Sequence, residues 1–273
     1  MKINVGGLIE NLNDVTISAN NRAFTSGDSV KEVLRLVNGE IFDWENHYFN
    51  LMASMRIYRM NIPLSFTPEF FQEEIKKVSN ANNFINGKIE FVCYRDFALD
   101  ILKSEIKFLI KIENSNENWI LKNADAEIEV YKDYTINSSY YSSINAPHPE
   151  EIIAEIFRLE NEYEDLILLN KDKRIARTLK GSIFVLKDGI IKTPKFEEGV
   201  IKSVYRNYFI DKINKSEDYT LEEVEIFPFE IQKADEVFVL LDGEGILSIT
   251  QNRKKVFQTK ETQNIFERYI LKN

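Results

Sequence analysis

Three short apolar runs separated by charged turns, all within residues 164–194, constrain the fold of this chain more than any other stretch. Residues 166–169 are four consecutive branched apolar side chains, a pattern typical of a strand buried on both faces. The two later runs flank Asp188-Gly189, a dipeptide that favours a two-residue hairpin turn. We therefore predict a small antiparallel meander over residues 164–194.

The pattern over residues 1–112 predicts a sheet covered by two helices. Asn38-Gly39 separates two apolar runs and indicates a hairpin, and Thr67-Pro68 suits the N-cap and the first position of a helix. The full expectation is β-structure over residues 1–45, a helix over 44–60, a second helix from 68, and strands over 88–95 and 105–112.

A polar run at residues 113–118 has no apolar periodicity and indicates a linker or an exposed turn. We therefore predict an α+β protein of two domains, with the first over residues 1–115 and the second over residues 116–273. Besides the meander, the second half predicts helices over 149–163, 199–212 and 262–271, and strands over 127–136, 222–227, 236–241 and 246–250.

Composition excludes several classes of function. The 35 basic and 44 acidic residues give a net charge of −9, which argues against nucleic acid or an anionic membrane as the main partner. No run approaches the ~20 apolar residues of a spanning helix, and the polar N-terminus is unlike a signal peptide. Cys93 is the single cysteine, so we expect an inert core thiol, no disulfide and no metal site. A cytoplasmic protein is predicted.

Several blocks recur in a fixed order along the chain: residues 22–28 (RAFTSGD) with Glu32; His47, Leu51 and Ser54 on the first expected helix; spaced positions from 183 to 206; and residues 234–238 (ADEVF). In this order they resemble the class IV aminotransferases. That pyridoxal-phosphate family of fold type IV includes branched-chain and D-amino-acid aminotransferases and aminodeoxychorismate lyase.

The resemblance implies a small N-terminal α/β domain, a larger C-terminal β-rich pseudo-barrel domain, and a homodimer with the cofactor between the domains. It also implies a lysine that forms a Schiff base with pyridoxal phosphate and a glutamate that faces the ring nitrogen. An arginine, a hydroxyl and the backbone amides of a helix start would bind the phosphate.

The lysine that the resemblance implies is missing. Depending on the register, Ser142, Ile144 or Asn145 stands in its place, and no lysine occurs between Lys132 and Lys171. An imine requires a primary amine, which none of these three side chains supplies.

The other cofactor positions also depart from the family pattern. Arg177 stands at the position of the glutamate, which reverses the charge facing the ring. The remaining positions are Ser182 for the signature asparagine, Asn50 for the phosphate-binding arginine, Leu240 for the hydroxyl, and Ser203, Val204 and Tyr205 for the helix start, where backbone amides remain. We therefore expect no bound cofactor and a family member without pyridoxal-phosphate catalysis. The alternative is an active aminotransferase or lyase with a displaced lysine, at Lys180 or Lys132.

Two further interpretations remain open in the sequence. Arg177 and the Ser203 helix start would favour a weakly bound small carboxylate or phosphate, unless Arg177 is a surface residue of the basic run around it. Arg22, Tyr94 and Arg95 would line a carboxylate pocket on the substrate side, or form salt bridges and strand packing. We interpret His47 as a structural residue and His148 as a loop residue.

Overall fold

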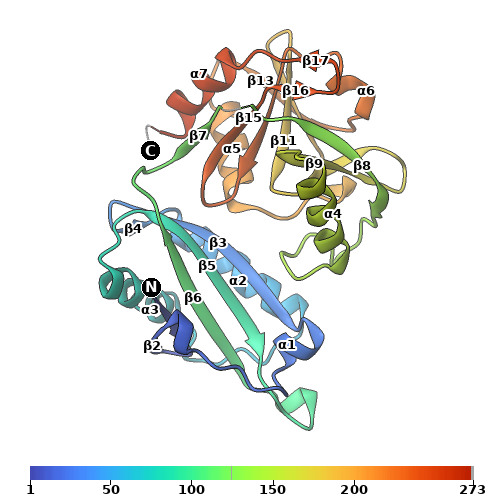
Figure 1. The fold of residues 1–273 in the computed structure, drawn as a ribbon. Coiled ribbons are helices and arrows are strands. Elements are labelled where there is room, and N and C mark those ends of the chain that lie inside the picture. Colours follow the sequence, from blue (N-terminus) through green and yellow to red (C-terminus); the bar gives the residue numbers. More distant parts are fainter. Residues whose placement is uncertain (124, 272–273) are drawn as a thin grey trace. The chain divides into compact units, whose positions relative to one another are not determined.

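A computed structural model describes residues 1–123 and 125–271, and these divide into two compact units (Figure 1). Unit 1 comprises Met1–Asn118 and Ile144–Pro147, and unit 2 comprises the rest. Unit 1 extends past the predicted end at residue 115 because the buried Arg35 guanidinium donates to the Asn118 carbonyl (2.7 Å) and to the Ser115 hydroxyl (2.9 Å). The polar run after residue 114 is therefore held against unit 1.

Unit 1 is an antiparallel sheet with helices packed on it. Its strand order is β2-β1-β6-β5-β3-β4. The strands are β1 (Lys2–Val5), β2 (Leu8–Asn11), β3 (Ser29–Val37), β4 (Glu40–Ile41), β5 (Gly87–Arg95) and β6 (Ile106–Asn114). The helices are α1 (Arg22–Ser26), α2 (Trp44–Ile57) and α3 (Pro68–Asn82), with single turns at Leu12–Asp14 and Ile101–Lys103.

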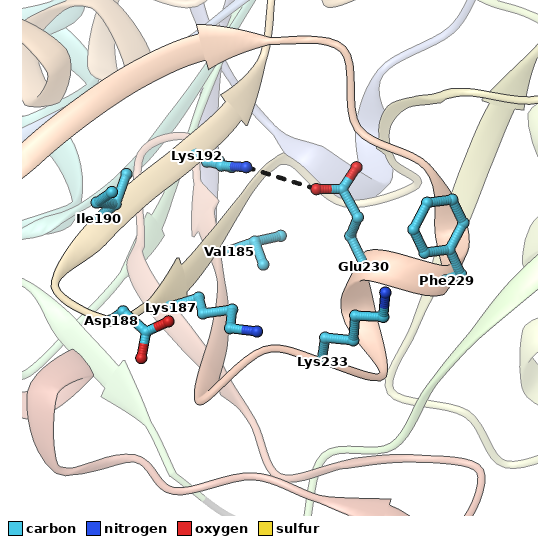
Figure 2. A pocket seen from close by; sticks show the side chains of 8 residues that line it. All are labelled: Val185, Lys187, Asp188, Ile190, Lys192, Phe229, Glu230 and Lys233. Atoms are coloured by element: carbon cyan, nitrogen blue, oxygen red, sulfur yellow. Dashed lines mark ion pairs between the residues drawn. The ribbon is translucent and has the colours of Figure 1, made fainter.

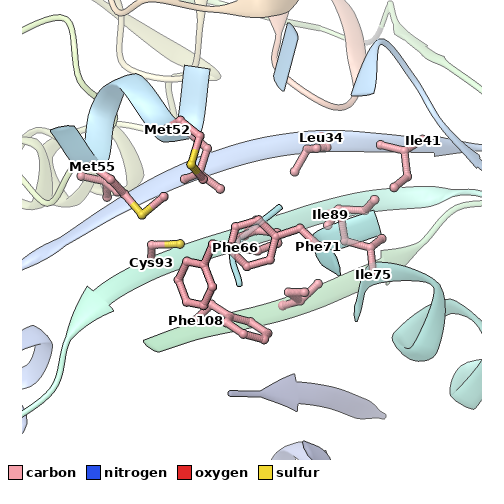
Figure 3. Close-up of a cluster of buried hydrophobic side chains, with 14 of the residues drawn as sticks. Leu34, Ile41, Met52, Met55, Phe66, Phe71, Ile75, Ile89, Cys93 and Phe108 are labelled. Atoms are coloured by element: carbon pink, nitrogen blue, oxygen red, sulfur yellow. The ribbon is translucent and has the colours of Figure 1, made fainter. Parts of the chain in front are cut away.

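The core of unit 1 follows from the alternation of side chains along its strands. Ile89, Phe91 and Cys93 of β5 are fully buried, whereas their neighbours along the strand are only half-buried. Phe71 of α3 packs on Phe91 with ring centroids 4.8 Å apart, in the cluster shown in Figure 3. Burial raises the pKa of the Cys93 thiol, so Cys93 is the inert core residue that its neighbours predicted.

Unit 2 holds two larger sheets and a short hairpin among its described residues. The sheet orders are β10-β9-β8, β13-β12-β11-β14-β15-β7 and β16-β17. The strands are β7 (Ile120–Lys122), β8 (Ile128–Ile136), β9 (Asp165–Asn170), β10 (Ile175–Thr178), β11 (Ser182–Lys187), β12 (Ile190–Pro194), β13 (Thr220–Val224), β14 (Glu236–Leu241), β15 (Gly245–Ile249), β16 (Gln251–Asn252) and β17 (Lys255–Val256). The helices are α4 (Pro149–Glu160), α5 (Val204–Asn214), α6 (Pro228–Ile231) and α7 (Lys260–Tyr269), with one turn at Phe196–Glu198.

The predicted meander over residues 164–194 is wrong as a single sheet. Its first pair, β9 and β10, belongs to the three-stranded sheet, and its second pair, β11 and β12, belongs to the six-stranded one. The chain turns between them at Gly181, where a Cβ atom would lie 2.2 Å from the Leu240 carbonyl oxygen. Because of this close approach, β11 pairs with β14 in the six-stranded sheet and does not continue the sheet of β9 and β10. The run at residues 166–169 is a buried strand, as predicted.

The helix predicted over residues 199–212 begins later, at Val204. Gly199 has φ of 107° and ends the preceding single turn, and Ser203 is extended (φ −118°). The Ser203 hydroxyl accepts a hydrogen bond from the Arg206 amide at 3.1 Å, which makes Ser203 the N-cap of α5. The expected α+β class is confirmed, and no helix of the described residues has the length and apolar character needed to cross a membrane.

Candidate functional site

The segment where the lysine was expected contributes to unit 1 through its buried side chains. Ile144 is 2 % exposed and belongs to the apolar core of unit 1, and the Asn145 carbonyl accepts a hydrogen bond from the Lys31 amide of β3 at 2.8 Å. Ser142 closes a turn instead, because its hydroxyl donates to the Ser139 carbonyl (2.8 Å) and accepts from the Ser139 amide (2.9 Å). Ser142 and Ile144 are therefore structural residues of this segment.

Arg177 lies on β10 and is buried, so the interpretation that places it on the surface is wrong. Its guanidinium forms an ion pair with Glu151 of α4 and donates to the Thr178 carbonyl at 3.4 Å. A buried guanidinium is stable only when its charge is balanced, and Glu151 supplies that balance from inside unit 2. The basic residues around Arg177 in the sequence gave no sign that its side chain is buried.

The start of α5 is occupied by a carboxylate of the chain itself. The Ser203 hydroxyl donates to the Asp242 carboxylate at 2.6 Å, and Ser203 is 4 % exposed. A helix start attracts anions because its first amides lack partners within the helix and carry a partial positive charge. Asp242 follows β14 directly and places a negative charge at this point. From the sequence, Leu240 was assigned to the hydroxyl position, and Asp242, two residues later, was given no role.

The other predicted positions around this helix start are packed into unit 2. Ser182 begins β11 and lies opposite Leu240 of β14, and both are buried. Val204 and Tyr205 are buried in the first turn of α5, where the Tyr205 ring meets Trp119 edge-on with centroids 5.7 Å apart. The structure thus places Ser182 opposite Leu240, and Tyr205 beside Trp119, which sequence analysis did not single out.

Asn50 belongs to a buried polar cluster in unit 1. Its side-chain amide donates to the Glu32 carboxylate at 2.9 Å, and the other Glu32 oxygen lies 2.6 Å from His47 Nδ1. All three residues are less than a tenth exposed. His47 is therefore the structural residue that was predicted, and the Asn50 amide helps to satisfy a buried carboxylate.

Arg22 and Arg95 both bind the Asp28 carboxylate in unit 1, whereas the Tyr94 side chain lies on the other face of the sheet. Asp28 accepts from Arg95 Nη1 at 2.6 Å and from Arg22 Nε at 2.8 Å. Tyr94 precedes Arg95 on β5, so its side chain lies on the opposite face of the sheet, where it lines a cavity of about 880 Å³ with Asp96 and Lys107. The salt-bridge interpretation therefore describes Arg22 and Arg95, and the three residues do not form one pocket.

Side chains that could ligate a metal ion do not cluster in the part of the chain that the structure describes. Within it, no group of three or more histidine, cysteine or acidic side chains is arranged to hold a metal ion. The expectation of no metal site rested on the single cysteine.

Comparison with known proteins gives a consistent set of similarities. Residues 29–251 match the family model described as amino-transferase class IV. The chain is 22% identical to D-alanine aminotransferase of Listeria innocua over 266 residues, which cover 92% of this chain and 87% of that protein. It is 23% identical to a putative branched-chain-amino-acid aminotransferase of Methanocaldococcus jannaschii, covering 97% and 92% of the two chains.

Solved structures show the same fold. The branched-chain aminotransferase of Thermoproteus uzoniensis superposes with a TM-score of 0.87 at 22% identity, over 98% of this chain and 93% of that one. A putative 4-amino-4-deoxychorismate lyase from Legionella pneumophila gives a TM-score of 0.80 at 17% identity, over 92% and 93%.

Proposed function

Because this chain belongs to the class IV aminotransferase family, we propose that it is a family member without pyridoxal-phosphate catalysis, which persists as a binding or interaction protein. The observation that carries the proposal is the absence of any lysine between Lys132 and Lys171. When bound in this family, the cofactor acts through an imine to a lysine amine, and a hydroxyl, an amide or an alkyl group cannot form that bond.

The side chains around the other cofactor positions do not fit pyridoxal phosphate either. The Asp242 carboxylate at the start of α5 would repel a phosphate group, and the charge of Arg177 is already balanced by Glu151. The amide of Asn50, which stands in place of the phosphate-binding arginine, donates to Glu32. A small anion at the α5 start would have to displace Asp242, so we propose that carboxylates and phosphate bind there only weakly.

The rival function, a working enzyme with a displaced lysine, lacks a favourable observation. The Lys180 amine lies 2.7 Å from a Glu164 carboxylate oxygen, and Lys132 is exposed on β8. An ammonium held in an ion pair is a poor nucleophile, because its lone pair carries a proton.

The first prediction tests the proposal with the purified chain and added pyridoxal phosphate. We expect no visible absorption band of an internal aldimine, no pyridoxyl group fixed to one lysine after borohydride reduction, and loss of the cofactor on dialysis. Peptide mapping distinguishes scattered surface labelling from a single site. One stoichiometrically labelled lysine would overturn the proposal, and Lys180→Ala and Lys132→Ala would then show which amine is used.

The second prediction concerns assembly. We propose a homodimer, because a dimer interface depends on apolar burial rather than on the cofactor. A group of exposed apolar side chains on α4 supports this, since Ile152, Ile156 and Leu159 share one helix face and are 62%, 46% and 60% exposed. Sedimentation velocity at micromolar concentration is expected to show a dimer, and a monomer at every concentration tested would refute it.

A further inference from the structure

A cavity of about 390 Å³ opens in unit 2 between the β11–β12 hairpin and α6 (Figure 2). It lies at the end of β11 opposite to Ser182, because Lys187 is five residues further along the strand, roughly 17 Å at the usual rise. It is therefore separate from the residues discussed above. Its lining consists of Val185, Lys187, Asp188, Ile190, Lys192, Phe229, Glu230 and Lys233.

The wall of this cavity has an apolar and aromatic part. Val185 and Ile190 come from the two strands of the hairpin, and the Phe229 ring stands on α6, 57% exposed. An exposed aromatic ring beside aliphatic side chains leaves apolar surface in contact with water, which a flat apolar molecule would cover.

The rim of the cavity is basic. The Lys192 amine is balanced by Glu230, whose carboxylate lies 3.6 Å away. Within the described part of the chain, Lys187 and Lys233 have no carboxylate within ion-pair distance, and the Lys233 amine lies 5.0 Å from the centre of the Phe229 ring. Figure 2 shows Lys187 extending from the hairpin toward Lys233, which lies in the turn after α6. Among the lining residues three lysines face two acids, Asp188 and Glu230, so the lining carries a net charge of 3 − 2 = +1, and the Asp235 carboxylate lies just outside it, 2.9 Å from the Asp188 amide.

This positive site stands out because the chain as a whole carries a net charge of −9. A local positive charge on an acidic protein selects small anions, whereas a polyanion such as nucleic acid would be repelled by the remaining surface. The volume lies in the range of small-molecule sites.

We propose that this cavity binds a small aromatic carboxylate, with the ring between Val185, Ile190 and Phe229 and the carboxylate between the Lys187 and Lys233 amines. Inorganic phosphate would satisfy the amines but leave the apolar wall uncovered. A neutral aromatic molecule would cover the wall but leave both amines without a counter-charge. The proposal needs both parts of the lining and does not depend on whether the family's cofactor is used.

The test compares benzoate with benzamide, which has the same shape and no charge. In amide nuclear magnetic resonance spectra of the full chain, benzoate is expected to shift the signals of Val185, Lys187, Ile190 and Phe229. Benzamide should bind at least about tenfold more weakly, because it cannot pair with the amines. Inorganic phosphate is a second control and is expected to give little shift at Val185 and Phe229.

Lysine variants test whether the Lys187 and Lys233 amines bind the carboxylate of benzoate. Lys187→Ala combined with Lys233→Ala is expected to weaken benzoate binding at least about fivefold, whereas Lys171→Ala, an exposed lysine in the β9–β10 turn, should leave it unchanged. The same spectra report whether each variant is folded. Equal shifts from benzoate and benzamide, no shift with either, or full benzoate binding by the double variant would each refute the proposal.

Discussion

Replacing Ile144 by lysine is expected to destabilise the protein by at least about 3 kcal/mol, because it removes a buried aliphatic side chain and inserts an ammonium into the core of unit 1. This substitution places a lysine at one of the three positions where the family resemblance expects it. The amine would enter apolar surroundings, and burial without a partner disfavours its charged form. Urea unfolding followed by circular dichroism measures the loss.

Two neighbouring substitutions serve as controls. Ser142→Lys and Asn145→Lys place the same side chain at half-buried positions of the same segment, and each is expected to cost less than about 1 kcal/mol. If Ile144→Lys unfolds at the same urea concentration as these two, Ile144 does not contribute to the core as described. The result also separates the three registers, because only positions 142 and 145 could then accept a lysine without loss of stability.

Replacing Asp165 by asparagine is expected to stabilise the protein at neutral pH by up to roughly 3 kcal/mol. Asp165 begins β9 and is fully buried, and burial raises the pKa of its carboxyl from 3.8 to about 6. The Thr178 hydroxyl, the Leu166 amide and the Lys180 charge lower the pKa of this carboxyl and offset the burial only in part. Ionised Asp165 therefore costs the folded state free energy that the unfolded chain does not lose.

The pH dependence follows from the same shift. A carboxyl with a raised pKa in the folded state binds its proton more tightly there, so its penalty is absent below about pH 4 and complete above about pH 6. The parent chain should lose stability relative to Asp165→Asn as pH rises through this window. The positive charges near Asp165 are those of Lys180, which pairs with Glu164, and of Arg158 on α4, whose pKa is raised by its hydrogen bond to Glu155.

The measurement is the free energy of unfolding of parent and variant at about pH 4 and about pH 7. Asp133→Asn, which changes an exposed carboxylate on β8, controls for net charge. If the free energies of unfolding of parent and Asp165→Asn differ by the same amount at both pH values, the pKa of Asp165 is not raised in the folded state.

Local features of this fold were predictable because short-range chemistry determines them. Asn38-Gly39 and Asp188-Gly189 both adopt positive φ at their two residues (51° and 84°, 50° and 79°), as the predicted hairpin turns require. Thr67 caps α3 by accepting from the Phe70 amide at 3.2 Å. In each case the residues that decide the structure are adjacent in sequence.

The errors concern partners that lie far apart in the chain. The split of the meander depends on β11 pairing with β14, in which Ser182 meets Leu240. The carboxylate at the start of α5 comes from Asp242, 39 residues after Ser203. A single sequence carries no local pattern for such pairs, so the positions that the family resemblance points to could be named from the sequence, whereas the side chains that contact them could not.

The return of residues 144–147 to unit 1 has a consequence for protein synthesis. A ribosome releases Met1–Asn118 first, yet Ile144 and Ala146 belong to the same apolar core. Until residue 147 has emerged, the nascent first unit lacks these two side chains and exposes the apolar surface that they cover. The order in which the chain is made therefore differs from the order in which its first core can be completed.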